Sequence, residues 1–206
     1  MRPFRHLTPR YIWNRTALIV YERANPGQPW LTPDMIKILD SWLCPADVGL
    51  EFGSGRSTSW FAAHVKHLTS VEHNPEWYSL VQKQLQGYQG DYFLREDGST
   101  NSPTSEYVNV AKQIAPASLD FCLIDGVARD HCALASLDKL KAGGLLIIDN
   151  ANWYIPRERK TFSPNSRDLA DGYASEVWAQ VGEQIKDWRC VWTTSGVTDT
   201  AFWVKP

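Results

Sequence analysis

The order of apolar and polar positions along the chain predicts alternating strands and helices between residues 48 and 149. Short, almost continuously apolar runs are expected strands, and longer runs with apolar residues three and four positions apart are expected helices. The expected strands are 48–52, 67–72, 91–95, 119–124 and 144–149, and the expected helices are 57–65, 75–86, 104–115 and 130–141. This alternation indicates a parallel sheet that is covered by helices on both faces.

The two ends of the chain carry different signals. A helix is expected over 33–43, because Thr32 is a suitable N-cap and a proline follows it at the first helical position. Near the other end, a helix around 171–187 precedes two strands, 190–194 and 201–204, whose connection is too short for a parallel crossover. The sequence therefore predicts an α/β fold with a Rossmann-like, doubly wound, mostly parallel seven-stranded sheet that ends in an antiparallel hairpin.

The length of 206 residues fits one domain with a full core. We assign 33–206 to this domain and 1–32 to a basic and aromatic leader with an extended segment, in which no acid precedes Glu22. We expect the leader to form a helix packed on the domain, and its interleaved aromatic residues leave contact with a membrane surface as an alternative. Its arginines before that acid are Arg2, Arg5, Arg10 and Arg15.

Composition narrows the class of protein further. The net charge is −2 with both signs mixed, which gives no overall nucleic-acid signature. No apolar run approaches the ~20 residues of a membrane span. The cysteines lie far apart without a Cys-x-x-Cys pair, which is typical of reduced thiols in a cytoplasmic protein and not of a zinc site or disulfide framework. They are Cys44, Cys122, Cys132 and Cys190.

The stretch from Val48 to Thr58 carries the most informative chemistry. An apolar strand reaches an acid, Glu51, and then breaks into a glycine turn that opens the helix 57–65. Glycine lets a backbone turn sharply and lie against a ligand, and the helix N-terminus behind it offers unpaired N–H groups. A second acid, Glu72, ends the next strand, where a βαβ unit places the acid that holds ribose hydroxyls. This arrangement indicates a nucleoside-binding site.

The spacing of these residues separates two kinds of nucleoside cofactor. A dinucleotide site requires a third glycine in Gly-x-Gly-x-x-Gly, and Thr58 stands at that position. Glu51 precedes the first glycine by two residues and suits a cationic amino group better than a pyrophosphate. The set of Glu51, Gly53, Gly55 and Glu72 resembles the first two motifs of class I S-adenosylmethionine-dependent methyltransferases. In that family the glycine turn and its acid surround the methionine part of the cofactor, and the second acid binds the ribose.

The resemblance implies that S-adenosylmethionine is the cofactor. The stretches 125–132 and 194–203 are similar to a broad group of uncharacterised bacterial methyltransferase-domain proteins. The residues predicted to bind the cofactor are Glu51, Gly53, Ser54, Gly55, Ser57, Glu72, His73, Asp97, Gly98 and Asp125.

Two further acids are expected to face one crevice at the carboxyl ends of the fourth and fifth strands, Asp125 and Asp149. Together with a Glu-x-Asn-Pro sequence after the second strand and with Asn150, they resemble the catechol and caffeoyl-CoA type O-methyltransferases. The resemblance implies that Asp125, Asp149 and Asn150 bind a divalent metal, Mg²⁺, that holds the substrate hydroxyls. A structural turn and a loop hydrogen bond are the alternative roles for these residues.

This chain departs from those enzymes at the residue proposed as their general base. They carry a lysine shortly after the strand-four acid, and Ala128 stands there in this sequence. The neighbouring Arg129 is always protonated, so His131, His73 or a metal-activated hydroxyl are the candidates for removing the proton. The predicted catalytic residues are Asp125, His131 and Asp149.

A long aromatic and basic segment, 151–167, follows the fifth strand and is expected to cover the carboxyl end of the sheet. It predicts a small-molecule acceptor that is anionic or that carries a sugar or a ring, with a merely solubilising loop as the alternative. Its aromatic and basic residues are Trp153, Tyr154, Phe162, Arg157, Arg159, Lys160 and Arg167.

Together, these features predict a methyltransferase that acts on an oxygen of a small acceptor and has no nucleic-acid partner. A protein that binds S-adenosylmethionine without turnover remains an alternative, as does a dinucleotide-dependent oxidoreductase. The oligomeric state has no signal in the sequence.

Overall fold

The computed structural model describes residues 7–85, 87 and 90–206. The predicted arginines Arg2 and Arg5 and the last residue of the expected helix 75–86 lie outside these residues. The helices are α1 (Pro9–Ala24), α2 (Pro33–Trp42), α3 (Arg56–His64), α4 (Pro75–Gln82), α5 (Glu106–Gln113), α6 (Arg129–Ser136) and α7 (Glu176–Ile185), with 3₁₀ turns η1 (Glu96–Thr100) and η2 (Ala151–Trp153). The strands are β1 (Val48–Phe52), β2 (His67–Glu72), β3 (Gly90–Leu94), β4 (Leu119–Ile124), β5 (Leu140–Asp149), β6 (Arg189–Thr194) and β7 (Asp199–Val204).

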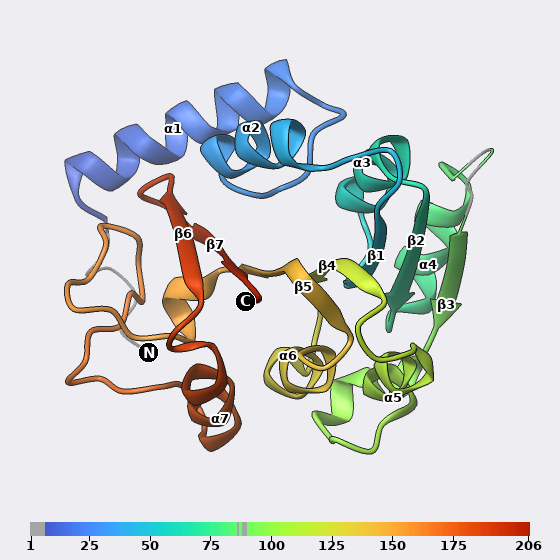
Figure 1. Cartoon of the computed structure of the whole chain (residues 1–206). Helices are drawn as coiled ribbons and strands as arrows, with labels where there is room; N and C mark the ends of the chain where they lie inside the picture. Colours follow the sequence, from blue (N-terminus) through green and yellow to red (C-terminus); the bar gives the residue numbers. More distant parts are fainter. Residues whose placement is uncertain (1–6, 86, 88–89) are drawn as a thin grey trace.

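These strands form one seven-stranded sheet in the order β3-β2-β1-β4-β5-β7-β6. The first five strands are parallel, and β7 pairs antiparallel with both β5 and β6. The predicted doubly wound sheet with an antiparallel C-terminal hairpin is therefore confirmed (Figure 1).

The sheet is buried on both faces because its central strands send alternate apolar side chains to opposite sides. In β5, Leu146 and Ile148 belong to the core cluster that α5, α6 and α7 complete, whereas Leu145 and Ile147 belong to the cluster that α2 and α3 complete. The helices lie on the two sides of the sheet accordingly (Figure 1). This sandwich brings the carboxyl ends of the parallel strands together at one edge.

Several element boundaries differ from the sequence prediction. β5 begins four residues earlier than expected, at Leu140, because that residue pairs with Leu119 across a register shift. α7 begins later than expected, because Ser175 accepts the Trp178 N–H and caps the helix there. Thr32 stands at the N-cap of α2 but makes no side-chain cap bond, and its hydroxyl contacts that of Thr193 instead.

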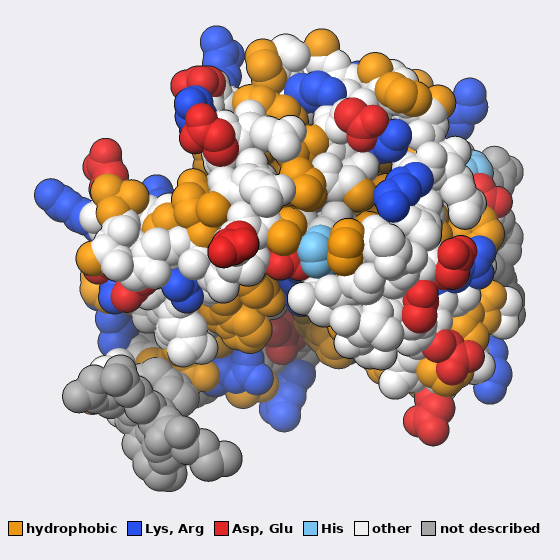
Figure 2. All heavy atoms as spheres, turned by 90° about the horizontal axis from the view of Figure 1, so that it is seen from below, with side chains coloured by type: hydrophobic (Ala, Val, Ile, Leu, Met, Phe, Trp, Pro, Cys, Tyr) orange, Lys and Arg blue, Asp and Glu red, His pale blue; other side chains and the backbone are white. Residues whose placement is uncertain are grey.

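The leader contains α1, which packs on the domain and crosses above the turn between β6 and β7 (Figure 1). Leu18 is the buried residue of this helix, and Asn14 lies against the turn, where a Cβ on Gly196 would stand 2.0 Å from its amide nitrogen. Among the described residues, no helix is both long and apolar enough to cross a membrane. On the face seen from below in Figure 2, Lys and Arg side chains are scattered among acidic ones and form no continuous basic patch.

Candidate functional site

A cavity of about 440 Å³ lies beyond the carboxyl ends of β1, β2 and β4. Three turns supply most of its lining: 53–57 after β1, 72–74 after β2 and 125–127 after β4. The side chains of Trp30 and Trp77 complete the wall. The volume falls in the range of small-molecule sites, and most of the predicted cofactor residues line it. We call it the cofactor cavity.

Backbone contact between two turns explains the first glycine of the motif. Gly53 has φ +93°, and a Cβ there would lie 2.5 Å from the backbone of Gly126. At Gly126, a Cβ would lie 2.0 Å from the hydroxyl oxygen of Tyr107. Only residues without a side chain let the turns after β1 and β4 meet in this way.

Glu51 lies beneath the glycine turn and does not line the cavity. Its side chain is fully buried, and one carboxylate oxygen accepts hydrogen bonds of 2.6 Å from both Thr58 and Ser70. Burial raises the pKa of Glu51 to about 7, although hydrogen bonds from Ser57, Ser70 and Thr58 oppose this shift. The acid therefore secures the start of α3 and changes its protonation near neutral pH.

Glu72 lies in the wall of the cavity, where protein donors already use both of its oxygens. Oε2 accepts from the backbone N–H (3.0 Å) and the hydroxyl (2.9 Å) of Ser54, and Oε1 accepts from the N–H groups of His73 (2.9 Å) and Asn74 (2.8 Å). The indole of Trp77 donates to the carbonyl of Ser54 at 2.7 Å and holds the same turn. A ribose hydroxyl must therefore share Oε2 with Ser54 or displace its hydroxyl.

Asp97 and Gly98 do not line the cofactor cavity. The carboxylate of Asp97 accepts the backbone N–H groups of Glu106 (2.6 Å) and Tyr107 (3.1 Å), which caps the start of α5. Gly98 is pressed against the Tyr107 ring, where a Cβ would be 2.7 Å away. In this structure both residues position α5, and their predicted contact with the cofactor stays a prediction.

A larger cavity of about 1000 Å³ adjoins the cofactor cavity and shares Trp30 and Asp125 with it. One wall comes from α1 and another from the chain after β5, and the turn between β6 and β7 closes it. We call it the acceptor cavity. Its lining residues are Tyr11, Arg15, Leu18, Glu22, Trp30, Leu31, Asp125, Asp149, Asn150, Trp153, Pro164, Asn165, Val197 and Thr198.

The predicted acids meet at the boundary of the two cavities, as the sequence suggested. Burial raises the pKa of both Asp125 and Asp149, and the Asp125 charge raises that of Asp149 further. The Arg129 guanidinium opposes both shifts. Asp149 also accepts a hydrogen bond of 2.7 Å from Thr200. Two neighbouring carboxylates, Asp149 buried and Asp125 partly exposed, favour holding a proton between them even beside one cation.

The three residues predicted to bind Mg²⁺ do not fit a metal ion. Arg129 donates to Asp125 Oδ1 at 3.0 Å and to Asn150 Oδ1 at 3.1 Å, so a guanidinium occupies the place of the cation. The amide nitrogen of Asn150 donates to Thr198 Oγ1 at 2.5 Å, which fixes the side chain in this orientation. The described part of the chain also holds no group of three His, Cys, Asp or Glu residues placed to bind a metal ion.

The two histidine candidates lie in different places. His73 lines the cofactor cavity and its Nδ1 lies 3.0 Å from Glu72 Oε1. His131 lines neither the cofactor cavity nor the acceptor cavity. Its backbone N–H donates to Asp130, whose carboxylate also accepts from Ser175. The proposed catalytic role of His131 therefore has no support in this arrangement.

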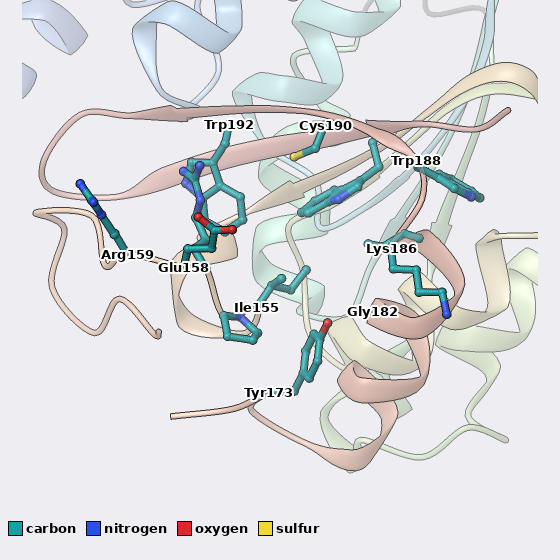
Figure 3. Close-up of a pocket in the computed structure, with 13 residues that line it drawn as sticks. Ile155, Glu158, Arg159, Tyr173, Gly182, Lys186, Trp188, Cys190 and Trp192 are labelled. Atoms are coloured by element: carbon teal, nitrogen blue, oxygen red, sulfur yellow. The ribbon is translucent and has the colours of Figure 1, made fainter. Parts of the chain in front are cut away.

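The cations of the basic segment do not line the acceptor cavity, and their predicted role in binding the acceptor stays a prediction. Arg157 and Arg159 line a third cavity of about 670 Å³ between the segment 155–159, α7 and β6, where Trp188 and Trp192 also lie (Figure 3). Lys160 pairs with Asp171 at 2.7 Å and Asp168 at 3.5 Å. Of the residues singled out in that segment, Trp153 alone lines the acceptor cavity.

Sequence reasoning missed the contribution of α1, because no motif marks Tyr11, Arg15 or Glu22 as facing acids that stand more than 100 residues further along the chain. It also passed over Trp30, which stands in the extended segment. The signal available for Arg129 was its place four residues after the strand-four acid and directly after Ala128, the position where the catechol-type enzymes carry a lysine.

Comparison with known proteins supports the fold. A methyltransferase-like protein from Silicibacter pomeroyi matches with a TM-score of 0.57, 20% identity, and coverage of 87% of this chain and 89% of that one. A candidate caffeoyl-CoA O-methyltransferase from Staphylococcus aureus matches with a TM-score of 0.58, 15% identity, and coverage of 93% and 91%. An N-methyltransferase from Bradyrhizobium japonicum matches with a TM-score of 0.50, 12% identity, and coverage of 84% and 93%.

No family model and no curated protein matches the sequence. The similarity to these solved structures therefore rests on tertiary structure at low sequence identity. The chain has the fold of S-adenosylmethionine-dependent methyltransferases, and the similar structures include proteins described as acting on oxygen and on nitrogen.

Proposed function

We propose that this protein transfers a methyl group from S-adenosylmethionine to a hydroxyl oxygen of a small acceptor, in the cytoplasm. The observation that carries the proposal is the pair of adjoining cavities that share Asp125 and Trp30. One is lined by a glycine turn and a strand-end acid, and the other by acids and aromatic rings. Two sites in contact are what a direct transfer between two bound molecules needs.

The residues of the cofactor cavity fit a nucleoside with a methionine tail. Gly55 leaves open space, since a Cβ there would be 3.9 Å from its nearest neighbour, Trp77. Glu72 can accept from ribose hydroxyls once the Ser54 hydroxyl turns away. Glu51 lies beneath the turn, and its charged form would favour the binding of the cofactor's cationic amino group.

When bound, the cofactor supplies an electrophilic methyl group on a sulfonium ion. The remaining task is to hold an acceptor oxygen in line with that methyl and to remove its proton. As the new carbon–oxygen bond forms, the carbon–sulfur bond breaks and its electrons stay on sulfur. We assign the proton to the carboxylate of Asp149, which lines the acceptor cavity and returns the proton to solvent.

Calorimetry with S-adenosylhomocysteine tests the cofactor site. Binding to the wild-type protein is expected, and Glu72→Ala should weaken it at least about tenfold because the ribose loses a charged acceptor. Ser54→Ala should keep or improve the affinity, since it removes the hydroxyl that competes for Oε2 of Glu72 and leaves the backbone N–H bond in place. Glu76→Ala changes an exposed acid on α4 and is the matched control.

If S-adenosylhomocysteine does not bind to the wild-type protein, the proposal is wrong. Release of S-adenosylhomocysteine on incubation with S-adenosylmethionine and candidate acceptors separates an enzyme from a protein that only binds the cofactor. Methylated product recovered at a nitrogen would keep the reaction class and overturn the assignment to oxygen.

A further inference from the structure

The carboxyl ends of β4 and β5 create a place that needs a positive charge. The strands pair in parallel register up to Ile124 and Ile148, so the residues that follow lie next to each other. The side chain of Asp125 is 25% exposed and that of Asp149 is buried. Asn150 adds an amide oxygen beside them. Two acids and an amide oxygen form an oxygen-rich set that would attract a divalent cation.

Arg129 supplies that charge from within the chain. Its Nε donates to the carbonyl of Gly126 at 2.8 Å. Nη1 donates to the carbonyl of Asp149 at 2.7 Å and to Asn150 Oδ1 at 3.1 Å, and Nη2 donates to the carbonyl and Oδ1 of Asp125 at 2.8 and 3.0 Å. A guanidinium has five N–H donors, and these bonds use all of them. The side chain of Arg129 is thus fixed at the strand ends with no N–H donor left over.

The backbone is shaped to hold this arrangement. Ala128 has φ 47° and Asn150 has φ 53°, and these two residues flank the guanidinium on its own helix and on the facing strand end. A non-glycine residue in the left-handed region costs about 1 kcal/mol and persists where the surroundings enforce it. The positive φ at Ala128 lets Arg129 begin α6 with its side chain directed back to the sheet.

We propose that the Arg129 guanidinium permanently takes the place of a divalent metal ion in this site. The inference extends the proposed function, because it also defines the acceptor. Without a metal, no ion is there to chelate two adjacent hydroxyls. The acceptor therefore needs only one hydroxyl, positioned against Asp149 and the aromatic rings, and a vicinal diol has no advantage.

Manganese calorimetry tests the inference independently of methyl transfer. Wild-type protein should bind no Mn²⁺ at millimolar concentration, because Arg129 donates to Asp125 Oδ1 and Asn150 Oδ1 and places its positive charge beside both acids. Arg129→Ala should gain a site of at least about tenfold higher affinity, because the two acids are left without a cation. Adding Asp149→Asn to that variant should abolish the gain. Lys141→Ala is the matched control, since it removes a cation from a single surface acid, Asp120.

Mn²⁺ binding to the wild-type protein that Asp149→Asn removes would overturn the inference, and so would an Arg129→Ala variant that folds without gaining a site. If Arg129→Ala fails to fold, Arg129→Met replaces it, because methionine fills similar space without the charge. The wild-type titration tests the inference without any variant. A phenol with one hydroxyl should be methylated at the same rate in excess chelator as in the absence of chelator. Loss of that turnover would overturn the inference, whereas absence of S-adenosylhomocysteine binding would instead remove the proposed function.

Discussion

At the scale of single residues, the buried acids of this protein are held by protein donors, and they differ in whether they also reach a cavity. Glu51 and Glu72 were both predicted to touch the cofactor, and their surroundings differ. Glu72 lies in the cavity wall, whereas Glu51 lies one layer deeper, under the turn that it secures. The sequence gives the acid and its spacing, but the depth of each side chain depends on how the turn folds over it.

Glu51 should make the protein less stable as the pH rises. Its pKa is about 7 in the folded protein against 4.5 for the ordinary group, so the folded state binds the proton more tightly. The stability that this proton provides is present below pH 4.5 and is lost as the pH rises through about 7. Up to about 3 kcal/mol of unfolding free energy is expected to depend on it.

Urea denaturation at pH 5.5 and 8.5 measures this effect with Glu51→Gln, which stays neutral and keeps an acceptor oxygen for Thr58 and Ser70. The variant should lose less stability between the two pH values than the wild-type protein does. Glu76→Gln, an exposed acid, should retain the wild-type profile. Equal pH dependence in the wild-type protein and Glu51→Gln would show that Glu51 is charged in the folded state.

At the scale of elements, one close contact between β1 and β4 explains a glycine in the middle of a strand. Gly49 pairs with Phe121, and the Phe121 ring lies over the glycine and stacks on Phe61 with centroids 4.8 Å apart. A Cβ on Gly49 would stand 2.0 Å from the ring. Glycine weakens a strand in general, but here it makes room for an aromatic stack that fills the core beneath α3.

Gly49→Ala is expected to lower the free energy of unfolding by about 2–3 kcal/mol, because the ring must leave a well-packed position. Phe121→Leu should restore part of that loss in the double variant, so that the two changes together cost less than their sum. Gly27→Ala is the control, since a Cβ there has no neighbour within 4 Å. Purely additive effects in urea denaturation would contradict the contact.

At the scale of the whole molecule, the acceptor cavity is assembled from segments far apart in the sequence. Residues of α1 face Asp149 and Trp153, and the turn between β6 and β7 closes the space between them. The cation available to an anionic acceptor in this cavity is Arg15, whereas Arg157 and Arg159 lie in the separate cavity beside α7. We therefore expect Arg15, and not the segment after β5, to supply the charge.

An aromatic carboxylate such as 4-hydroxybenzoate is a suitable probe, titrated in the presence of S-adenosylhomocysteine. Arg15→Gln should weaken its binding about tenfold through loss of a charge-assisted hydrogen bond. The double variant Arg157→Gln/Arg159→Gln should bind it as the wild-type protein does. Arg23→Gln, in the last turn of α1, is the matched control. Weaker binding in the double variant and unchanged binding in Arg15→Gln would return the acceptor charge to the segment after β5.

The sequence by itself determined the mostly parallel sheet, the antiparallel final hairpin and the glycine turn. These features depend on local signals: apolar periodicity, caps, turn residues and the short connection between the last two strands. It also placed Asp125 and Asp149 together, because the carboxyl ends of adjacent parallel strands meet at one edge.

Only the tertiary structure decided what each polar group binds. Asp97 caps a helix, and the Ser54 hydroxyl donates to the Glu72 carboxylate. Arg129 donates to the residues predicted to bind a metal, and α1 lines a cavity with residues that follow β5. Each of these outcomes depends on side chains brought together over long sequence separations. A buried polar group takes the partner that packing brings within reach, and no local pattern records which partner that is.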